Sequence, residues 1–287
     1  MRPADLPEDW PFKREARLVQ AGRLRFWVIE AGAPDAPALL LLHGTGASGH
    51  SFRRTIPGLA RDHRVIVPDL PGHGCSATGF ARRLGLDEMA ADLWTLCDAL
   101  QAAPQAIIGH SAGAAIGLRM AEMRPLPQGI VGLNAALGEF EGAAGFIFPI
   151  LARGLASLPL ASGAMAALFG RAATVERILA GTGSPLDPAG REMYRRLVRD
   201  PDHLTGALGM MAQWRLQGLL SRLSQTRVPV ALIASEGDRA VPPEVSVEAA
   251  RRIPGARLHL LPRLGHLAHE EAEDGLSGLI LDCLRER

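Results

Sequence analysis

The sequence predicts an α/β fold, in which a mostly parallel central sheet carries helices on both faces and a helical cap is inserted after the sixth strand. Three observations predict it. Uninterrupted apolar runs such as Ala38 to Leu42 are typical of strands that are buried on both faces. Strand-like and helix-like stretches then alternate, as βαβ units require. The alternation resumes at Val230 after a long interruption, so strands of one sheet bracket an insertion.

The predicted elements follow from hydrophobic periodicity and turn signals. A hairpin is expected first, because two short apolar runs, 17–20 and 24–29, flank the turn pair Ala21-Gly22. The later elements, in chain order, are strands 38–42 and 64–67, helix 86–101, strand 105–108, helix 111–123, strand 129–133, strand 230–234, helix 244–253, strand 257–261 and helix 270–284. The core therefore comprises residues 1–137 and 228–287.

The cap, residues 138–227, has helical composition interrupted by prolines. Its first part, Ala143 to Phe169, carries Arg153 as its one charged residue. A membrane span is the competing interpretation, but Pro149 and Pro159 interrupt the stretch before it reaches the roughly 20 clean apolar residues that a span needs. We expect a cap that lines an apolar pocket, with peripheral contact to a membrane left open.

Charge and cysteine content exclude several classes of protein. The 31 Lys and Arg residues nearly balance 30 Asp and Glu residues, without a long block of one sign, so nucleic acid is not expected as a partner. The three cysteines, Cys75, Cys97 and Cys283, are odd in number and lack CxxC spacing, which argues against a disulfide framework and a cysteine metal site. With no secretory signal at the start, a cytoplasmic protein is expected.

One short motif carries the predicted chemistry. Residues 109–113 read Gly-His-Ser-Ala-Gly, which matches G-x-S-x-G with a buried strand before it and a helix after it. Such a turn exposes the serine hydroxyl above the sheet and brings a helix N-terminus close to developing negative charge. A serine that merely caps an ordinary helix is the alternative interpretation. We predict that Ser111 is a nucleophile.

Both partners of the serine should lie downstream, because the order along the chain in this arrangement is nucleophile, acid, histidine. Asp238 follows strand 230–234 and is the predicted acid, with Glu236 as a weaker competitor. The other location, after strand 129–133, offers Asn134, which has no charge to stabilise an imidazolium.

The predicted base is His266, which follows strand 257–261, because Gly265 lets the loop bend toward the serine. His269 lies three residues on and is the alternative. None of the nine histidines forms an H-E-x-x-H pair, so neither a catalytic metal nor a cofactor is expected.

The oxyanion of an acyl-transfer reaction needs two backbone N–H donors, one from the residue after the nucleophile and one from the loop after the first buried strand. Those donors would be Ala112 and Thr45. His43 is expected to pack beneath this loop. The candidate residues of the substrate pocket are His43, Gly44, His110 and Trp214.

Over its whole length the sequence resembles the α/β-hydrolase superfamily and, more narrowly, the magnesium-chelatase accessory proteins of bacteriochlorophyll gene clusters. The segments that carry the narrower resemblance are 9–11 (DWP), 43–48 (HGTGAS), 109–115 (GHSAGAA), 132–137 (GLNAAL), 181–184 (GTGS), 210–214 (MMAQW) and 265–270 (GHLAHE). The triad positions do not depart from the superfamily pattern. The cap segments have no chemistry that follows from their composition; segment 181–184 is interpreted either as a loop that binds a propionate or ester group, or as a hinge.

The resemblance implies a role in the magnesium branch of bacteriochlorophyll synthesis, with tetrapyrrole substrates, contacts to magnesium-chelatase subunits and a place beside the photosynthetic membrane. Three hypotheses follow. The chain is a serine hydrolase of an apolar ester, a porphyrin-binding accessory protein without turnover, or a generic esterase or carbon-carbon hydrolase of small apolar substrates.

Overall fold

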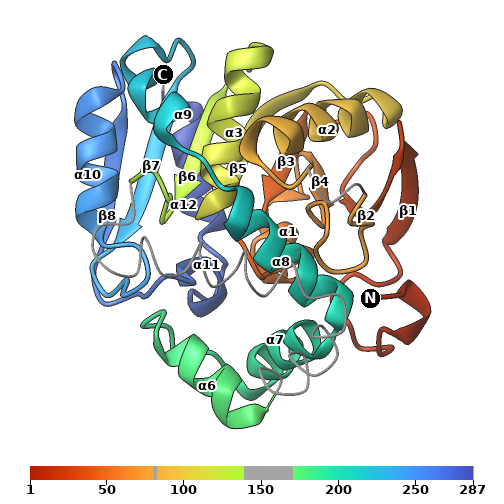
Figure 1. The fold of residues 1–287 in the computed structure, drawn as a ribbon. Helices are drawn as coiled ribbons and strands as arrows, with labels where there is room; N and C mark the ends of the chain where they lie inside the picture. Colours follow the sequence, from red (N-terminus) through yellow and green to blue (C-terminus); the bar gives the residue numbers. More distant parts are fainter. Residues whose placement is uncertain (80–82, 139–170, 287) are drawn as a thin grey trace.

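The computed structural model describes residues 1–79, 83–138 and 171–286 (Figure 1). Its centre is an eight-stranded sheet in the order β1-β2-β4-β3-β5-β6-β7-β8. The strands are β1 (Ala16–Ala21), β2 (Leu24–Ala31), β3 (Ala38–Leu42), β4 (Arg64–Pro68), β5 (Pro104–His110), β6 (Gly129–Leu133), β7 (Val230–Ser235) and β8 (Arg257–Leu261). The pairings of β1 with β2 and of β2 with β4 are antiparallel, and all the others are parallel. The predicted fold class is confirmed.

Successive side chains of β3 point to opposite faces of the sheet, and both faces are covered by helices. Leu40 and Leu42 belong to an apolar cluster with residues of α2 (Leu86–Ala99), α3 (Ala112–Met123) and α10 (Pro243–Arg252). Leu39 and Leu41 point the other way, into a second cluster with residues of α1 (Ile56–Leu59) and α12 (Ser277–Arg285). All four leucines are fully buried, as expected for a strand between two helical layers.

The strand registers place the predicted site residues at one edge of the sheet. His110 at the end of β5 pairs with Leu133 at the end of β6, and Leu133 pairs with Ile233 in β7. Ser235 at the end of β7 pairs with Leu261 at the end of β8. The loops that follow these four parallel strands therefore emerge side by side at their carboxyl ends.

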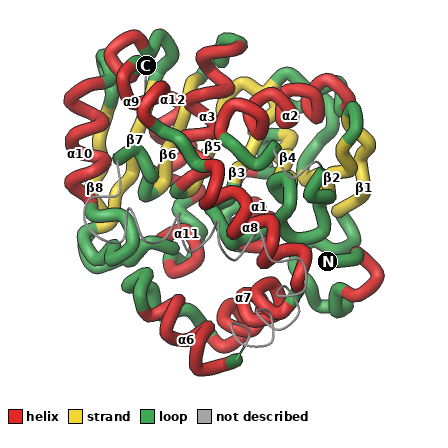
Figure 2. The backbone as a smooth tube through the Cα atoms, viewed as in Figure 1, coloured by secondary structure: helices red, strands yellow, loops and turns green. Residues whose placement is uncertain are grey.

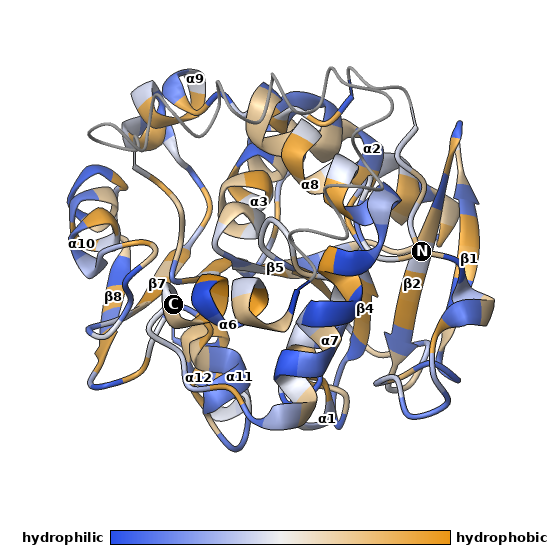
Figure 3. Cartoon of the chain, turned by 60° about the horizontal axis from the view of Figure 1, so that its bottom comes forward, coloured by the Kyte–Doolittle hydropathy of each residue, from blue (hydrophilic) through white to orange (hydrophobic). Residues whose placement is uncertain are grey.

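The chain between β6 and β7 contains four described α-helices: α6 (Ala172–Ala180), α7 (Pro188–Arg199), α8 (Pro201–Gln213) and α9 (Gln217–Ser221). Figure 2 shows α6 and α7 as a pair set apart from the sheet, whereas α8 crosses over the core. Buried residues of α6 and α7 share an apolar cluster with Leu6 and Trp10 of the N-terminal segment. The outer face of α7 is largely hydrophilic (Figure 3).

The predictions about a membrane span and about the apolar cap can be compared only with the residues that the structure describes. Among the helices formed by residues 1–79, 83–138 and 171–286, none is long and apolar enough to cross a bilayer. The apolar stretch Ala143 to Phe169, on which the prediction of an apolar pocket rests, lies outside the described residues.

The prediction of one continuous helix over residues 270–284 is wrong. The segment forms two helices, α11 (Ala268–Glu271) and α12, separated by a turn. At that turn Gly275 has a φ of +61°, and its carbonyl accepts a hydrogen bond of 2.8 Å from the Thr55 hydroxyl. A Cβ atom at Gly275 would lie 2.3 Å from the Thr55 backbone nitrogen. A close tertiary contact therefore overrides the local helical periodicity.

Candidate active site

Ser111 lies between the last residue of β5 and the first residue of α3, in a backbone conformation that side chains rarely adopt. Its φ and ψ angles are 52° and −118°. Its backbone N–H donates to the Leu133 carbonyl at 2.9 Å, and its carbonyl accepts from the backbone N–H groups of Ala114 and Ala136 at 3.1 Å each. Such strain persists only where the surrounding structure fixes it, and it is typical of a serine on a strand-to-helix turn.

The two glycines of the motif permit the close packing of this turn. A Cβ atom at Gly109 would lie 2.4 Å from the Ala114 backbone, and one at Gly113 would lie 2.1 Å from the Leu42 carbonyl oxygen. Neither contact leaves room for a side chain. The helix N-terminus can therefore sit directly against the end of β3.

Asp238 and His266 are in contact. The Nδ1 atom of His266 lies 2.7 Å from the Oδ2 atom of Asp238, and both side chains are buried. The other oxygen of Asp238 accepts hydrogen bonds of 2.8 Å from the backbone N–H groups of Ala240 and Val241. Because a carboxylate only accepts, a neutral His266 imidazole carries its proton on Nδ1, which leaves the lone pair on Nε2. Glu236, the weaker candidate, is exposed on the same loop.

Asn134 holds the histidine loop, a role that the sequence analysis missed. Its Nδ2 atom donates to the carbonyls of Gly265 and His266 at 3.0 and 2.8 Å, and its Oδ1 atom accepts from the Ser235 backbone N–H at 2.8 Å. The side chain is 3% exposed. The signal available in the sequence is a polar residue directly after a fully buried apolar strand, where a side chain needs hydrogen-bond partners.

His110 also contacts the histidine loop. Its Nε2–H donates to the His266 carbonyl at 2.9 Å, and the two imidazole rings lie 4.7 Å apart between centroids. A Cβ atom at Gly44 would lie 3.0 Å from both the Ser111 Cβ and the His110 Nδ1. Gly44 and His110 thus occupy the space beside Ser111, where the sequence analysis placed pocket residues.

The two predicted oxyanion donors lie in different elements, Thr45 in the loop after β3 and Ala112 at the start of α3. Among the described residues, we find no acceptor for the backbone N–H of Thr45 or of Ala112. Ala112 is the first residue of α3, whose N–H groups have no partner within the helix. The Thr45 hydroxyl lies 3.4 Å from the sulfur of Met210 in α8, so the cap packs directly on this loop.

His43 and Trp214 lie in packed surroundings. His43 is fully buried; its Nδ1–H donates to the Gly44 carbonyl at 2.8 Å, and its Nε2 accepts from the Leu70 N–H at 2.9 Å. Trp214 follows α8 and packs, partly buried, against the apolar cluster of α2 and α3.

Burial keeps the histidines around the site neutral, because the charged form loses its hydration. Burial lowers the pKa of His73 to about 4 and that of His269 to about 3. It also lowers the pKa values of four further imidazoles well below their usual range: His43, His50, His110 and His203. Neither ring nitrogen of His269, the alternative base, has a partner among the described residues.

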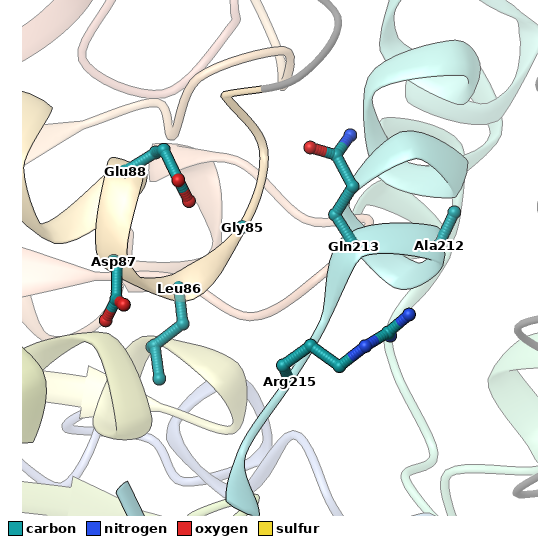
Figure 4. Close-up of a pocket in the computed structure, with 7 residues that line it drawn as sticks. All are labelled: Gly85, Leu86, Asp87, Glu88, Ala212, Gln213 and Arg215. Atoms are coloured by element: carbon teal, nitrogen blue, oxygen red, sulfur yellow. The ribbon is translucent and has the colours of Figure 1, made fainter. Parts of the chain in front are cut away.

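A surface pocket of about 560 Å³ lies between the start of α2 and the end of α8 (Figure 4). Its lining residues are Gly85, Leu86, Asp87, Glu88, Ala212, Gln213 and Arg215. This lining combines acidic and basic side chains and includes none of Ser111, Asp238 and His266, so it differs from the apolar pocket that the sequence predicts. In residues 1–79, 83–138 and 171–286, no group of three or more His, Cys, Asp and Glu side chains could hold a metal ion.

Comparison with known proteins decides the family. A family model described as the alpha/beta hydrolase fold matches residues 37–273. The chain belongs to the α/β-hydrolase family. This α/β-hydrolase is 51% identical over 284 residues to the magnesium-chelatase 30 kDa subunit of Rhodobacter capsulatus, with 99% of each chain covered. Both resemblances seen in the motifs are thereby confirmed.

More distant relatives share the fold. The chain is 28% identical to the pimeloyl-[acyl-carrier protein] methyl ester esterase of Vibrio atlanticus, covering 84% of this chain and 90% of the relative. The crystal structure of an α/β-hydrolase fold protein from Burkholderia ambifaria superposes with a TM-score of 0.76 at 25% identity, covering 93% of this chain and 99% of that one.

Proposed function

We propose that this α/β-hydrolase is a serine hydrolase of an apolar ester-type substrate, with Ser111, His266 and Asp238 as its catalytic triad. The observation that carries the proposal is the combination of a strained serine between β5 and α3 with a buried Asp238–His266 pair at the carboxyl ends of neighbouring strands. A hydroxyl is a weak nucleophile until a neighbouring imidazole removes its proton.

The reaction divides into two acyl transfers. Ser111 attacks the carbonyl carbon of the ester while Nε2 of His266 takes the hydroxyl proton, and Asp238 stabilises the resulting imidazolium through Nδ1–H. The N–H groups of Thr45 and Ala112 donate to the oxyanion. The imidazolium then protonates the leaving alkoxide. The same imidazole then deprotonates a water molecule that attacks the acyl-serine, and the resulting imidazolium returns the proton to the Ser111 oxygen as the acid leaves.

The biological role of this chemistry is proposed from the similarity to the Rhodobacter capsulatus protein. The protein that is 51% identical over nearly the whole chain is named as a magnesium-chelatase subunit. Such similarity along both chains supports a related role for this protein, at the magnesium-chelatase step of bacteriochlorophyll synthesis, in contact with chelatase subunits and beside the photosynthetic membrane. A tetrapyrrole carries both an extended apolar ring and carboxyl or ester groups, so it fits an esterase site beneath a cap.

The test is covalent labelling with a fluorophosphonate, followed by peptide mapping, in the parent and in Ser111→Ala and His266→Ala. We expect modification at Ser111 in the parent and none in either variant. A folded parent that neither reacts with fluorophosphonates of two sizes nor hydrolyses short-chain p-nitrophenyl esters would refute the hydrolase proposal.

A second candidate is a porphyrin-binding accessory protein without turnover. It is favoured by the name of the same relative, which describes a chelatase subunit and not a hydrolase. Fluorescence titration with protoporphyrin IX distinguishes the two candidates. Equal affinity in the parent and in Ser111→Ala, together with no labelling of the parent, would support binding alone.

A further inference from the structure

The cap segment Gly181 to Ser184 contacts both catalytic loops. The Thr182 carbonyl accepts a hydrogen bond of 2.9 Å from the His266 backbone N–H and one of 3.3 Å from the Arg239 backbone N–H. One carbonyl of the cap therefore joins the loop of the predicted base to the loop of the predicted acid. The segment belongs to the motifs that had no chemical explanation from sequence.

Two glycines make this contact possible. Gly183 has a φ of +78°, and a Cβ atom there would lie 2.2 Å from the Gly237 carbonyl oxygen. A Cβ atom at Gly265 would lie 2.5 Å from the Gly183 carbonyl carbon and 2.6 Å from the Ser184 hydroxyl. The backbones of the cap and of both catalytic loops are thus packed closer than side chains would allow.

Ser184 and Glu271 complete the arrangement. The Ser184 hydroxyl accepts from the Leu267 N–H at 2.8 Å and donates to the Glu271 carboxylate at 2.5 Å. The same carboxylate oxygen accepts from the Gly265 N–H at 2.8 Å. The three successive N–H groups of residues 265 to 267 are therefore all bound, two of them by the cap.

We infer that segment 181–184 and Glu271 are the positioning element of His266, so that the imidazole is held against Asp238 only while the cap is docked. The inference rests on the proposed function for its catalytic meaning. On the carbonyl side, Asn134 and His110 hold the His266 peptide from within the sheet. On the N–H side the cap and α11 hold it, so the base is clamped between core and cap. This structural role for segment 181–184 stands beside the two sequence-based interpretations, a loop that binds a propionate or ester group and a hinge.

Separate contacts, a buried hydrogen bond and an ion pair, keep the cap docked on the core when the positioning element is altered. Glu270 is fully buried, accepts from the Tyr194 hydroxyl of α7 at 2.6 Å and pairs with Arg53 of the core. A second pair joins Arg54 to Asp187 at 3.0 Å. Removing the Ser184 hydroxyl leaves these contacts in place. Effects of Ser184→Ala can therefore be attributed to the histidine loop.

The experiment compares Ser184→Ala with Ser221→Ala, which removes an exposed hydroxyl from α9 of the same cap. It also compares Glu271→Ala with Glu271→Gln, because the amide keeps an oxygen that can accept both hydrogen bonds. We expect Ser184→Ala and Glu271→Ala to lower the rate constant of fluorophosphonate labelling about 10- to 100-fold, and the two controls to stay within about twofold of the parent. Thermal unfolding identifies any variant that has lost its fold.

A proton NMR signature tests the positioning without turnover. The Nδ1–H of a histidine bound to a carboxylate gives a far-downfield resonance, assigned here by its loss in His266→Gln. We expect it to broaden or vanish in Ser184→Ala and to persist in Ser221→Ala and Glu271→Gln. An unchanged resonance in folded Ser184→Ala and Glu271→Ala would overturn the inference. Absence of parent labelling with a resonance that depends on Ser184 would instead refute the proposed hydrolase and leave the positioning element established.

Discussion

The substitution Asp238→Asn tests the predicted acid through the proton position on His266. In the parent, one oxygen of Asp238 accepts two backbone hydrogen bonds and the other accepts from Nδ1 of His266. An amide at this position has one oxygen and one NH₂ group. Turning the NH₂ group toward Ala240 and Val241 would leave both backbone N–H donors facing another donor, and the buried one, that of Val241, would cost roughly 1–3 kcal/mol. The NH₂ group therefore faces His266.

In that orientation the amide donates to Nδ1, so the proton of the imidazole moves to Nε2. The nitrogen that should remove the Ser111 proton then has no lone pair. In a serine-protease triad the same change lowers turnover about 10⁴-fold, which corresponds to about 5.5 kcal/mol in the barrier. We expect a loss of this size in the rate constant of fluorophosphonate labelling, with a thermal midpoint close to that of the parent.

The matched control is Glu236→Gln, which makes the same chemical change at an exposed carboxylate two residues away. It should label at the parent rate. Labelling of Asp238→Asn within tenfold of the parent would refute the assignment of Asp238, and a large loss in Glu236→Gln would point to that residue.

Three further predictions concern strain, pH and the loop tether. Ser111→Gly should be more stable than Ser111→Ala by about 1 kcal/mol in urea unfolding, because glycine relieves the positive φ; greater stability of the alanine variant would contradict the strain. The free energy of unfolding should fall by at least about 2 kcal/mol between pH 7 and pH 5, measured by urea unfolding, since His73 and His269, with folded pKa values of about 4 and 3, take up protons on unfolding. This loss of stability begins as the pH falls below the unfolded histidine pKa near 6.5. It outweighs the opposite contribution of Asp69, whose pKa burial raises to about 6. A flat profile of stability against pH would exclude it. Asn134→Ala should lower the free energy of unfolding by about 3 kcal/mol, because three buried hydrogen bonds are lost, and an equal stability of parent and variant would count against the tether.

The sheet could be predicted because short local stretches of the sequence are enough to identify its strands. Apolar runs such as Ala38 to Leu42 and Gly129 to Leu133 have no polar face, which specifies a strand between two helical layers. The break between α11 and α12 could not be predicted, because it depends on a contact between Gly275 and Thr55, which are 220 residues apart.

The residues of the candidate site fall into the same two groups, those that local sequence identifies and those that depend on distant contacts. Ser111, Asp238 and His266 could be proposed from motif and chain order, since each follows a predicted strand. Asn134 and Ser184 could not, because their importance lies in hydrogen bonds to backbone groups 83 to 132 positions away. A polar residue after a buried strand can be noticed in a sequence, but the distant backbone groups that it binds cannot be read from it.

The insertion of α6 to α9 between two adjacent strands has a consequence for protein synthesis. Ser111 precedes the insertion, whereas Asp238 and His266 follow it, and β6 pairs directly with β7 across it. A nascent chain that has emerged only as far as the cap carries the proposed nucleophile without the proposed acid and base. Pairing β6 with β7 closes a long loop and must await the emergence of β7 from the ribosome. Ser111 therefore cannot meet Asp238 and His266 until the chain that follows the insertion has left the ribosome.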